Sequence, residues 1–339
     1  MADLSGGGRS ARVLVVGLGG TIAMAAGDGA EGVAPSLSAR QLVDAVPGLS
    51  RPGVELEVVT LRNVPGGSLT LGDLGELHDL LAERFAAGID GAVVTQGTDT
   101  IEECAFVLGL WHDGPQPVVV TGAMRNPTLA GADGPANLLA AITVAADPGA
   151  RDLGCLVVLA DEIHAAERVR KTHTSSVTAF VSANGGPLGY LAEGDVRLIN
   201  RPVKRRTMPV ISGTLPRVGL YTATLGDDGS LLGTFADECD GLVVAGFGVG
   251  HVPASWVAGL AAIAQRIPVV LASRTGAGFT GRRTYRYPGS ERDLAERGLI
   301  AAGGLDPYKA RLLLQLLLGG GVDRAGIVQE FSELQEGTT

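Results

Sequence analysis

The 339-residue sequence lacks the patterns that mark several large classes of protein. Its three cysteines have neither the spacing of a disulfide framework nor that of a metal-binding motif. No apolar stretch reaches the ~20 residues of a membrane-spanning helix, and the first residues contain no apolar core of a secretion signal. The formal net charge is -9 without a long run of either sign, which argues against nucleic acid or a membrane as partner. We therefore expect a cytoplasmic protein that acts on a small molecule, with reduced cysteines in its core.

Motifs for metals and nucleotide cofactors are missing as well. The five histidines show no metal-ligand spacing, and there is no Walker A pattern and no Gly-x-Ser-x-Gly elbow. Residues 276–281 match the glycine pattern of a dinucleotide fingerprint, but Arg282, Arg283 and Pro288 follow where an apolar helix should begin. We expect neither a metal nor a cofactor.

Short β-branched runs alternate with longer stretches of helical periodicity, which is typical of parallel strands joined by crossover helices. The first half predicts strands at residues 12–16, 56–61, 91–95, 117–121 and 153–159, and helices at 71–85, 100–111 and 135–146. The second half predicts strands at 217–224, 241–245 and 267–272, and helices at 253–265 and 306–318. Asp133 and Asp306 are candidate helix caps, and Gly319 is a candidate helix stop.

The length favours two domains, each with its own core. Residues 185–216 are rich in glycine, proline and arginine and have little helical periodicity, which indicates a hairpin followed by a connection. We predict an α/β fold of two domains, each a mainly parallel sheet flanked by helices, with the larger domain first. The predicted parts are a flexible start (1–10), an N-terminal catalytic domain (11–200), a linker (201–215) and a C-terminal domain (216–339).

Three loops that follow predicted strands are unusually polar, and ligands of parallel sheets bind where strands end. Residues 17–21 place Thr21 beyond three glycines, residues 95–100 put three threonines and an aspartate on one turn, and residues 121–125 form the third loop. Each loop also has a structural interpretation. Thr98, Asp99 or Thr100 could cap the following helix, and the glycines could form a tight strand-to-helix turn.

A series of motifs resembles the bacterial-type L-asparaginase family in order and spacing, over nearly the whole chain. The first is Gly19-Gly20-Thr21-Ile22-Ala23, and the second runs from Thr95-Gln96-Gly97-Thr98-Asp99 to Glu103. The remaining motifs lie at residues 121–125, 132–138, 171–174, 186–190 and 305–312. Together they make coincidence implausible.

The resemblance implies hydrolysis of L-asparagine to aspartate and ammonia without a cofactor, through an acyl-enzyme on a threonine. It makes Thr21 the first nucleophile and places Thr98, Asp99 and Lys171 in a second catalytic group. An enclosed lysine can lose its proton near neutral pH and accept one from a threonine or from the attacking water, with the aspartate orienting it. The alternative for Lys171 is a solvated surface lysine.

Backbone groups near the two threonines are suitable donors to a developing oxyanion. By resemblance, Gly20 and Gly97 and the carbonyl of Ala123 position the substrate. By resemblance, the family's serine that holds the substrate's α-carboxylate aligns with Gly66 here, and Gly66, Gly67 and the nearby Ser68 are the candidates for this subsite.

Two further positions depart from the family. Its mobile loop after the first threonine usually carries a tyrosine that pairs with the nucleophile, but residues 25–37 contain no aromatic residue. His251 stands where the family often has an asparagine that reaches the active site of a neighbouring subunit, and it is either a binding residue or a surface histidine. Tyr285, Tyr287 and Glu291 are candidates for the acidic contribution across that interface.

We therefore expect an asparaginase, with possible weak glutaminase activity, that forms a tetramer built from dimers with shared active sites. The alternatives are an amidase for another small amide and a catalytically weak homologue that binds an amino acid as a sensor. Retention of both threonines, the aspartate and the lysine favours the enzyme, because a binding protein needs no nucleophile.

Overall fold

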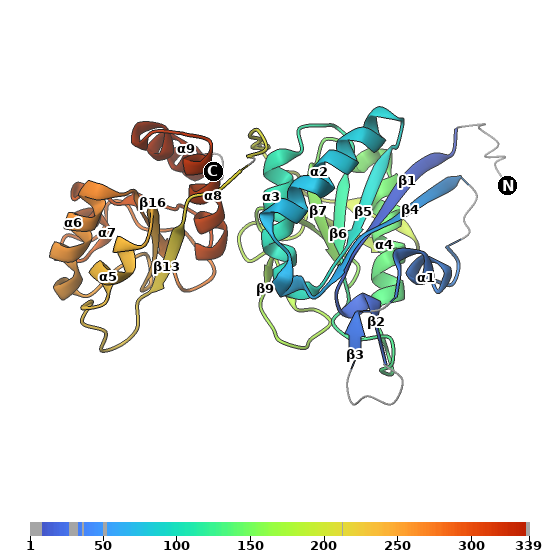
Figure 1. Ribbon diagram of the computed structural model, residues 1–339, viewed down its shortest axis with the longest axis horizontal. Helices are drawn as coiled ribbons and strands as arrows, with labels where there is room; N and C mark the ends of the chain where they lie inside the picture. The colour runs from blue at the N-terminus through green and yellow to red at the C-terminus, as the bar shows by residue number, and fades with distance from the viewer. Residues whose placement is uncertain (1–8, 27–32, 36, 50–52, 212, 337–339) are drawn as a thin grey trace. The chain divides into compact units, whose positions relative to one another are not determined.

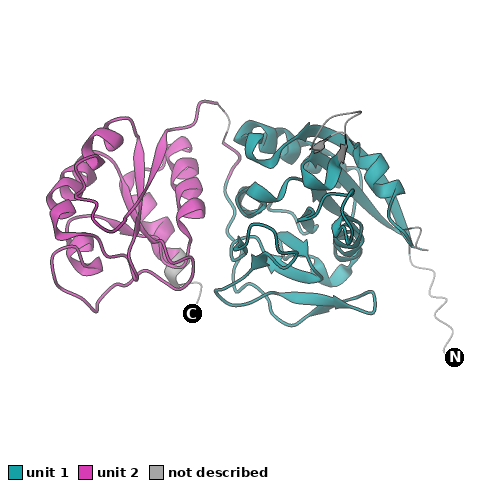
Figure 2. Ribbon diagram, turned by 90° about the horizontal axis from the view of Figure 1, so that it is seen from below, with its two compact units in different colours: residues 1–208 teal, residues 209–339 magenta. Residues whose placement is uncertain are grey.

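The computed structural model describes residues 9–26, 33–35, 37–49, 53–211 and 213–336. The chain forms two compact units, residues 1–208 and residues 209–339 (Figure 2). Most of the predicted flexible start lies outside the described residues.

The first unit is built on an eight-stranded sheet in the order β12-β11-β8-β7-β6-β5-β1-β4 (Figure 1). Five strands run parallel: β1 (Ala11–Gly19), β4 (Val54–Val64), β5 (Gly91–Thr95), β6 (Val118–Thr121) and β7 (Cys155–Leu159). The antiparallel strands are β8 (Glu162–Ala165), β11 (Gly189–Ala192) and β12 (Asp195–Leu198). β5, β6 and β7 are valine-rich and buried along their length, as expected for strands covered on both faces. The predicted parallel sheet and the late hairpin, β11–β12, are confirmed.

Helices cover both faces of this sheet. α1 (Ala39–Asp44) and α4 (Gly134–Ala146) pack on the face that presents Val13, Val93 and Val119, and α2 (Leu71–Ala86) and α3 (Ile101–Trp111) lie on the opposite face (Figure 1). The shorter elements are η1 (Thr21–Ala23), β2 (Met24–Ala26), β3 (Val33–Pro35), η2 (Gly66–Ser68), η3 (Thr98–Thr100), η4 (Pro148–Ala150), β9 (Arg170–Lys171) and β10 (Phe180–Val181).

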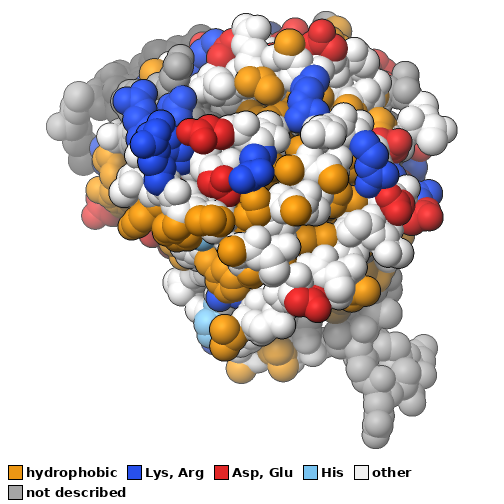
Figure 3. Space-filling model, turned by 90° about the vertical axis from the view of Figure 1, so that its left-hand side faces the viewer, with side chains coloured by type: hydrophobic (Ala, Val, Ile, Leu, Met, Phe, Trp, Pro, Cys, Tyr) orange, Lys and Arg blue, Asp and Glu red, His pale blue; other side chains and the backbone are white. Residues whose placement is uncertain are grey.

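The second unit has a four-stranded parallel sheet of β13 (Val218–Thr222), β14 (Gly241–Gly246), β15 (Val269–Ser273) and β16 (Ile300–Ala301). Its helices are α5 (Leu232–Asp237), η5 (Ala254–Trp256), α6 (Val257–Arg266), α7 (Glu291–Glu296), α8 (Pro307–Gly319) and α9 (Arg324–Glu336). On the face drawn in Figure 3, basic side chains lie among acidic and hydrophobic ones. The predicted fold class is confirmed.

Local predictions had mixed outcomes. Asp306 caps α8 as predicted, because its carboxylate accepts from the backbone N–H groups of Tyr308 and Lys309. Gly319 is the last residue of α8, and Gly320 caps that end instead. Asp133 precedes α4 without capping it, because its carboxylate binds another loop. Cys239 is half-buried and lies outside the core, whereas the other two cysteines are buried, and all three are free thiols.

A buried histidine anchors the segment that follows the parallel strands. His164 on β8 is 1% exposed, and its Nδ1 lies 3.0 Å from Oγ of Ser182, just after β10. β10 in turn pairs with β9, which carries Lys171. Burial lowers the pKa of His164 to about 4. The Glu162 carboxylate lies 3.3 Å from Nε2 but is half-exposed, so that water screens its charge and the ring stays neutral.

Acid should therefore destabilise the first unit. In the unfolded chain His164 takes up a proton near pH 6.5, whereas in the folded protein it does so only near pH 4. Its contribution to the free energy of unfolding is therefore fully present above pH 6.5 and is lost as the pH drops towards 4. The loss amounts to about 3 kcal/mol at 1.36 kcal/mol per pKa unit. Urea unfolding of the wild type and of His164→Asn across this range measures it: the variant should show a shallower decline, and equal slopes would contradict this account.

Candidate active site

Three strand-end loops of the first unit meet backbone to backbone at glycines. A Cβ placed on Gly20, after β1, would lie 2.1 Å from the backbone nitrogen of Gly97, after β5. A Cβ on Gly66, after β4, would lie 2.8 Å from the carbonyl oxygen of Gly97, and one on Gly97 would lie 2.6 Å from the nitrogen of Gly66. These distances are too short for real atoms, and Gly20 also has a positive φ of 81°. No side chain fits at the junction of these loops.

The junction places Thr21 and Thr98 on adjoining loops. Thr21 follows Gly20 directly and begins η1, and Thr98 follows Gly97 directly and begins η3. The hydroxyl of Thr100 donates to the Gly66 carbonyl at 2.9 Å and so ties the third loop to the other two. The backbones of the three loops are in direct contact at the glycines. These contacts bring the two candidate threonines into one neighbourhood.

Lys171 joins this neighbourhood from a segment 73 residues further along the chain. Its Nζ donates to Oγ1 of Thr98 at 2.9 Å and to Oδ1 of Asp99 at 2.8 Å. The Lys171 side chain is only 16% exposed and Thr98 is buried, whereas the Asp99 side chain is 75% exposed. The backbone nitrogen of Lys171 donates to Glu102 at 3.0 Å. Lys171 is therefore not a solvated surface lysine.

The alternative that these threonines and the aspartate merely cap α3 is wrong. The N-cap of α3 is Thr100, which makes no side-chain capping hydrogen bond. Thr98 and Asp99 accept hydrogen bonds from Lys171, and Thr100 donates to the Gly66 carbonyl. All three side chains of this turn bind groups outside the helix.

Thr21 is half-buried at the start of η1, where Ile22 and Ala23 are buried behind it. Within the described part of the chain, no side chain hydrogen-bonds to its hydroxyl. The stretch without aromatic residues, 25–37, contributes β2 and β3, and residues 27–32 and 36 lie outside the described residues.

The loop after β6 closes another side of the neighbourhood. A Cβ on Gly122 would lie 2.7 Å from the carbonyl oxygen of Gln96 and 3.2 Å from Cγ2 of Thr98. Ala123, the next residue, is 1% exposed. The structure therefore brings Ala123 close to the Thr98 turn, as the predicted site requires.

Asp133 and Asn137 hold that loop in place. The Asp133 carboxylate accepts from the backbone nitrogens of Met124 at 3.0 Å and Arg125 at 2.8 Å. The Asn137 amide donates to the Gly122 carbonyl at 3.0 Å. The sequence alone does not reveal the role of Asp133, because an aspartate just before a helix carries the same local signal as a cap.

His251 lies in the second unit, in a cluster with two tyrosines and a glutamate. Its Nε2 is 3.1 Å from Oε2 of Glu291, and its Nδ1 is 2.8 Å from the hydroxyl of Tyr287. Tyr285 packs edge-on against the imidazole, with ring centroids 4.8 Å apart. The candidates Tyr285, Tyr287 and Glu291 therefore share one site with His251.

The Glu291 carboxylate is fully buried, with 0% of its side chain exposed. Burial raises the pKa of Glu291. Hydrogen bonds from the backbone N–H of Tyr285, from His251 and from the backbone N–H of Thr284 lower it by more, so that the net pKa is lowered. For Tyr287, partial burial and the nearby Glu291 charge raise the pKa, so that its hydroxyl keeps its proton at neutral pH.

Comparisons with known proteins match both units. Residues 12–204 match the family model "Asparaginase, N-terminal", and residues 217–331 match "Glutaminase/Asparaginase C-terminal domain". The chain belongs to the asparaginase family. It is 38% identical to a "Probable L-asparaginase" of Deinococcus radiodurans over 95% of this chain and 97% of that protein. It is 34% identical to "L-asparaginase 2" of Escherichia coli over 95% and 92% of the two chains.

A solved structure gives the same result. The crystal structure of a "Probable Cytoplasmic L-asparaginase" from Campylobacter jejuni superposes with a TM-score of 0.85 at 32% identity, over 95% of this chain and 99% of that one. The recognition of the family from its motifs is therefore confirmed.

Gly66, which we expect at the family's serine position, has no room for a side chain unless the Gly97 backbone moves. Gly67 and Ser68 are exposed on η2, and open space surrounds the position of a Cβ on Gly67. The structure therefore explains why glycine stands at 66, whereas the roles of Gly67 and Ser68 in binding stay predictions.

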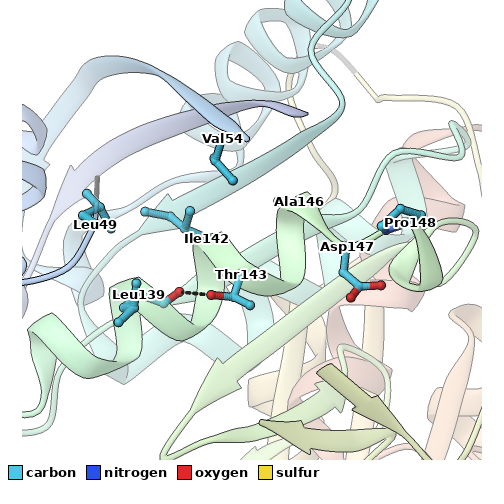
Figure 4. Close-up of a pocket in the computed structure, with 8 residues that line it drawn as sticks. All are labelled: Leu49, Val54, Leu139, Ile142, Thr143, Ala146, Asp147 and Pro148. Carbon is cyan, nitrogen blue, oxygen red and sulfur yellow. Dashed lines mark hydrogen bonds between the residues drawn. The ribbon is translucent and has the colours of Figure 1, made fainter. Parts of the chain in front are cut away.

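Other features of the described residues lie apart from this neighbourhood. A cavity of about 190 Å³ beside α4 is lined by mainly apolar side chains, and its two polar side chains bond to nearby backbone: Thr143 donates to the Leu139 carbonyl, and Asp147 accepts from Gly149 (Figure 4). It contains no candidate catalytic residue. Within the described ranges there is no group of three potential metal ligands, and no helix is long and apolar enough to cross a membrane.

The glycine junction predicts that two neighbouring substitutions differ in their effect on the free energy of unfolding. Gly66→Ala should lower the free energy of unfolding by about 1–3 kcal/mol, because the new methyl group overlaps the Gly97 backbone. Gly67→Ala should leave it nearly unchanged, because nothing lies within 4 Å of the added atom. Urea unfolding of both variants tests this, and equal stability of the two would contradict the proposed junction.

Proposed function

We propose that this protein hydrolyses the side-chain amide of L-asparagine to L-aspartate and ammonia through an acyl-enzyme on Thr21. The contact of Lys171 with both Thr98 and Asp99 carries the proposal, because it encloses a lysine beside a hydroxyl. The names of the relatives support the substrate.

The chemistry divides between the two threonines. Thr21 attacks the amide carbon, the oxyanion is stabilised by backbone N–H groups of the glycine junction, and ammonia leaves with the proton that Thr21 has lost. Water then attacks the ester. The proton of that water passes through the Thr98 hydroxyl to Lys171, which Asp99 keeps in position, and it returns to the Thr21 oxygen as the ester bond breaks and aspartate is released. The exposed side of the Asp99 carboxylate is free to bind the ammonium group of the substrate.

Substrate recognition rests on the loops of the junction. Gly20, Gly97 and the carbonyl of Ala123 position the amide, and Gly66, Gly67 and Ser68 surround the α-carboxylate. Loss of the serine hydroxyl at position 66 removes one hydrogen bond to a charged group, worth about 1.5–3 kcal/mol. The reduced affinity favours weak side activities, including a weak glutaminase, and leaves another small amide without an α-carboxylate as the second candidate substrate.

On this proposal, the active site is completed by a second copy of the chain in an oligomer. Thr21 lacks a base among the described residues of its own unit, and the His251 cluster of the second unit ends in half-exposed tyrosines. We assign this cluster to the active site of a neighbouring copy, within a tetramer built from dimers. A cytoplasmic location remains the prediction from the sequence.

Ammonia release tests the proposed function. The wild type should release ammonia from L-asparagine, and Thr21→Ala, Thr98→Ala and Lys171→Met should each lower the rate by at least about a hundredfold, because each removes a nucleophile or a proton acceptor. Lys204→Met, which changes an exposed lysine, is the matched control and should keep wild-type activity. Tight binding of asparagine without turnover would instead identify a sensor, and turnover of another amide alone would change the substrate.

A further inference from the structure

Lys171 lies on a short strand outside the main sheet of the first unit. β9 consists of Arg170 and Lys171, and it belongs to a two-stranded sheet with β10, apart from the eight-stranded sheet. The next residue, Thr172, donates its backbone N–H to the carbonyl of Ala179 at 2.7 Å. β10 therefore covers one edge of β9, and the backbone groups on the other edge need partners of their own.

Glu102, in the first turn of α3, binds that other edge. Its Oε2 accepts from the backbone nitrogen of Lys171 at 3.0 Å, across 69 residues of sequence, and lies 3.8 Å from Nε of Arg170. Glu102 is buried, with 7% of the residue exposed. A hydrogen bond to a charged acceptor is stronger than one between neutral groups. One buried carboxylate thus ties the strand of Lys171 to α3.

The same short segment holds both ends of Lys171. The Nζ of Lys171 donates to Thr98 and Asp99 in η3. Its backbone nitrogen donates to Glu102, three residues beyond Asp99. Because η3 leads directly into α3, backbone geometry fixes the spacing between these acceptors. Lys171 is therefore held between two points on one rigid element, and a shift of its backbone changes the distance from Nζ to Thr98.

We propose that Glu102 is a positioning residue that sets the reach of Lys171 to Thr98. This inference rests on the proposed function, in which Lys171 serves the hydrolysis of the acyl-enzyme. Glu102 acts through the backbone nitrogen of Lys171 and does not take part in the proton transfer. Without this hydrogen bond, β9 is free to move away from α3, and the amine meets Thr98 less often at hydrogen-bonding distance. Misplacement by about 1 Å can slow a catalysed step roughly a hundredfold.

The affected step predicts a distinctive kinetic pattern. With an acyl-enzyme intermediate, kcat/KM reports the steps up to formation of the ester, whereas kcat also includes its hydrolysis. A displaced Lys171 slows the hydrolysis, so that kcat and KM should fall together while kcat/KM stays nearly constant. A loss of folded protein would instead lower kcat and kcat/KM equally and leave KM unchanged.

Two conservative substitutions separate position from charge. Glu102→Gln keeps the length of the side chain and an oxygen that can accept from Lys171, whereas Glu102→Asp keeps the charge and is one carbon atom shorter. Steady-state kinetics of the full-length protein with asparagine should show kcat within about threefold of the wild type for Glu102→Gln. For Glu102→Asp, kcat should fall by about ten- to a hundredfold at nearly constant kcat/KM. Equal kcat in the two variants, the reverse order, or a parallel fall in kcat/KM would overturn the inference.

Glu103→Gln is the matched control. It removes a carboxylate from the same first turn of α3, but the side chain of Glu103 points about 100° away from that of Glu102 around the helix. This variant should keep the kcat of the wild type. A loss as large as that in Glu102→Asp would mean that the acidic turn acts as a whole, and it would contradict a role through the contact with Lys171.

Hydrogen exchange tests the contact without reference to activity. The backbone amide of Lys171 should exchange slowly in the wild type and in Glu102→Gln, and at least about tenfold faster in Glu102→Asp. Equal exchange in the three proteins, followed by mass spectrometry of the peptide that contains Lys171, would also overturn the inference. Failure of the proposed function is distinguished by the wild type, which would release no ammonia from asparagine while the exchange pattern stayed as expected.

Discussion

Close packing of backbone at Gly97 is the constraint on which the site depends. Gly20 and Gly66 approach Gly97 so closely that no side chain fits between them. The loops after β1, β4 and β5 are therefore fixed relative to one another before any catalytic side chain is considered. Thr21 and Thr98 follow two of these glycines directly, so that the junction sets their positions, and Lys171 then joins Thr98 and Asp99 from β9. This is a rigid arrangement of the kind that amide cleavage requires.

Much of the fold could be predicted from the sequence, because buried parallel strands such as β5 and amphipathic helices such as α2 are encoded by local periodicity. The grouping of Thr98 with Lys171 could not be derived that way, since they are 73 residues apart, and only the resemblance to a family suggested it. Local signals were also ambiguous. Asp133 precedes a helix as a cap does, but its carboxylate holds the loop of Met124 and Arg125.

The sequence departs from the family's motifs at Gly66 and in residues 25–37, which on the proposed function affects the α-carboxylate subsite and the activation of Thr21. The first is explained by the junction, which leaves no space at Gly66. The second concerns Thr21, because no side chain hydrogen-bonds to its hydroxyl within the described part of the chain. On the proposed function, the two threonines divide the catalytic steps: Thr21 forms the acyl-enzyme, and Thr98 with Lys171 serves its hydrolysis.

This division of labour is tested most directly by the location of the acyl-enzyme. If Lys171 serves the second step, the Lys171→Met variant should accumulate an aspartyl ester during turnover of asparagine. After an acid quench, mass spectrometry of its peptides should locate the ester on Thr21. An ester on Thr98, or no ester although the wild type turns over, would contradict the assignment of the two threonines.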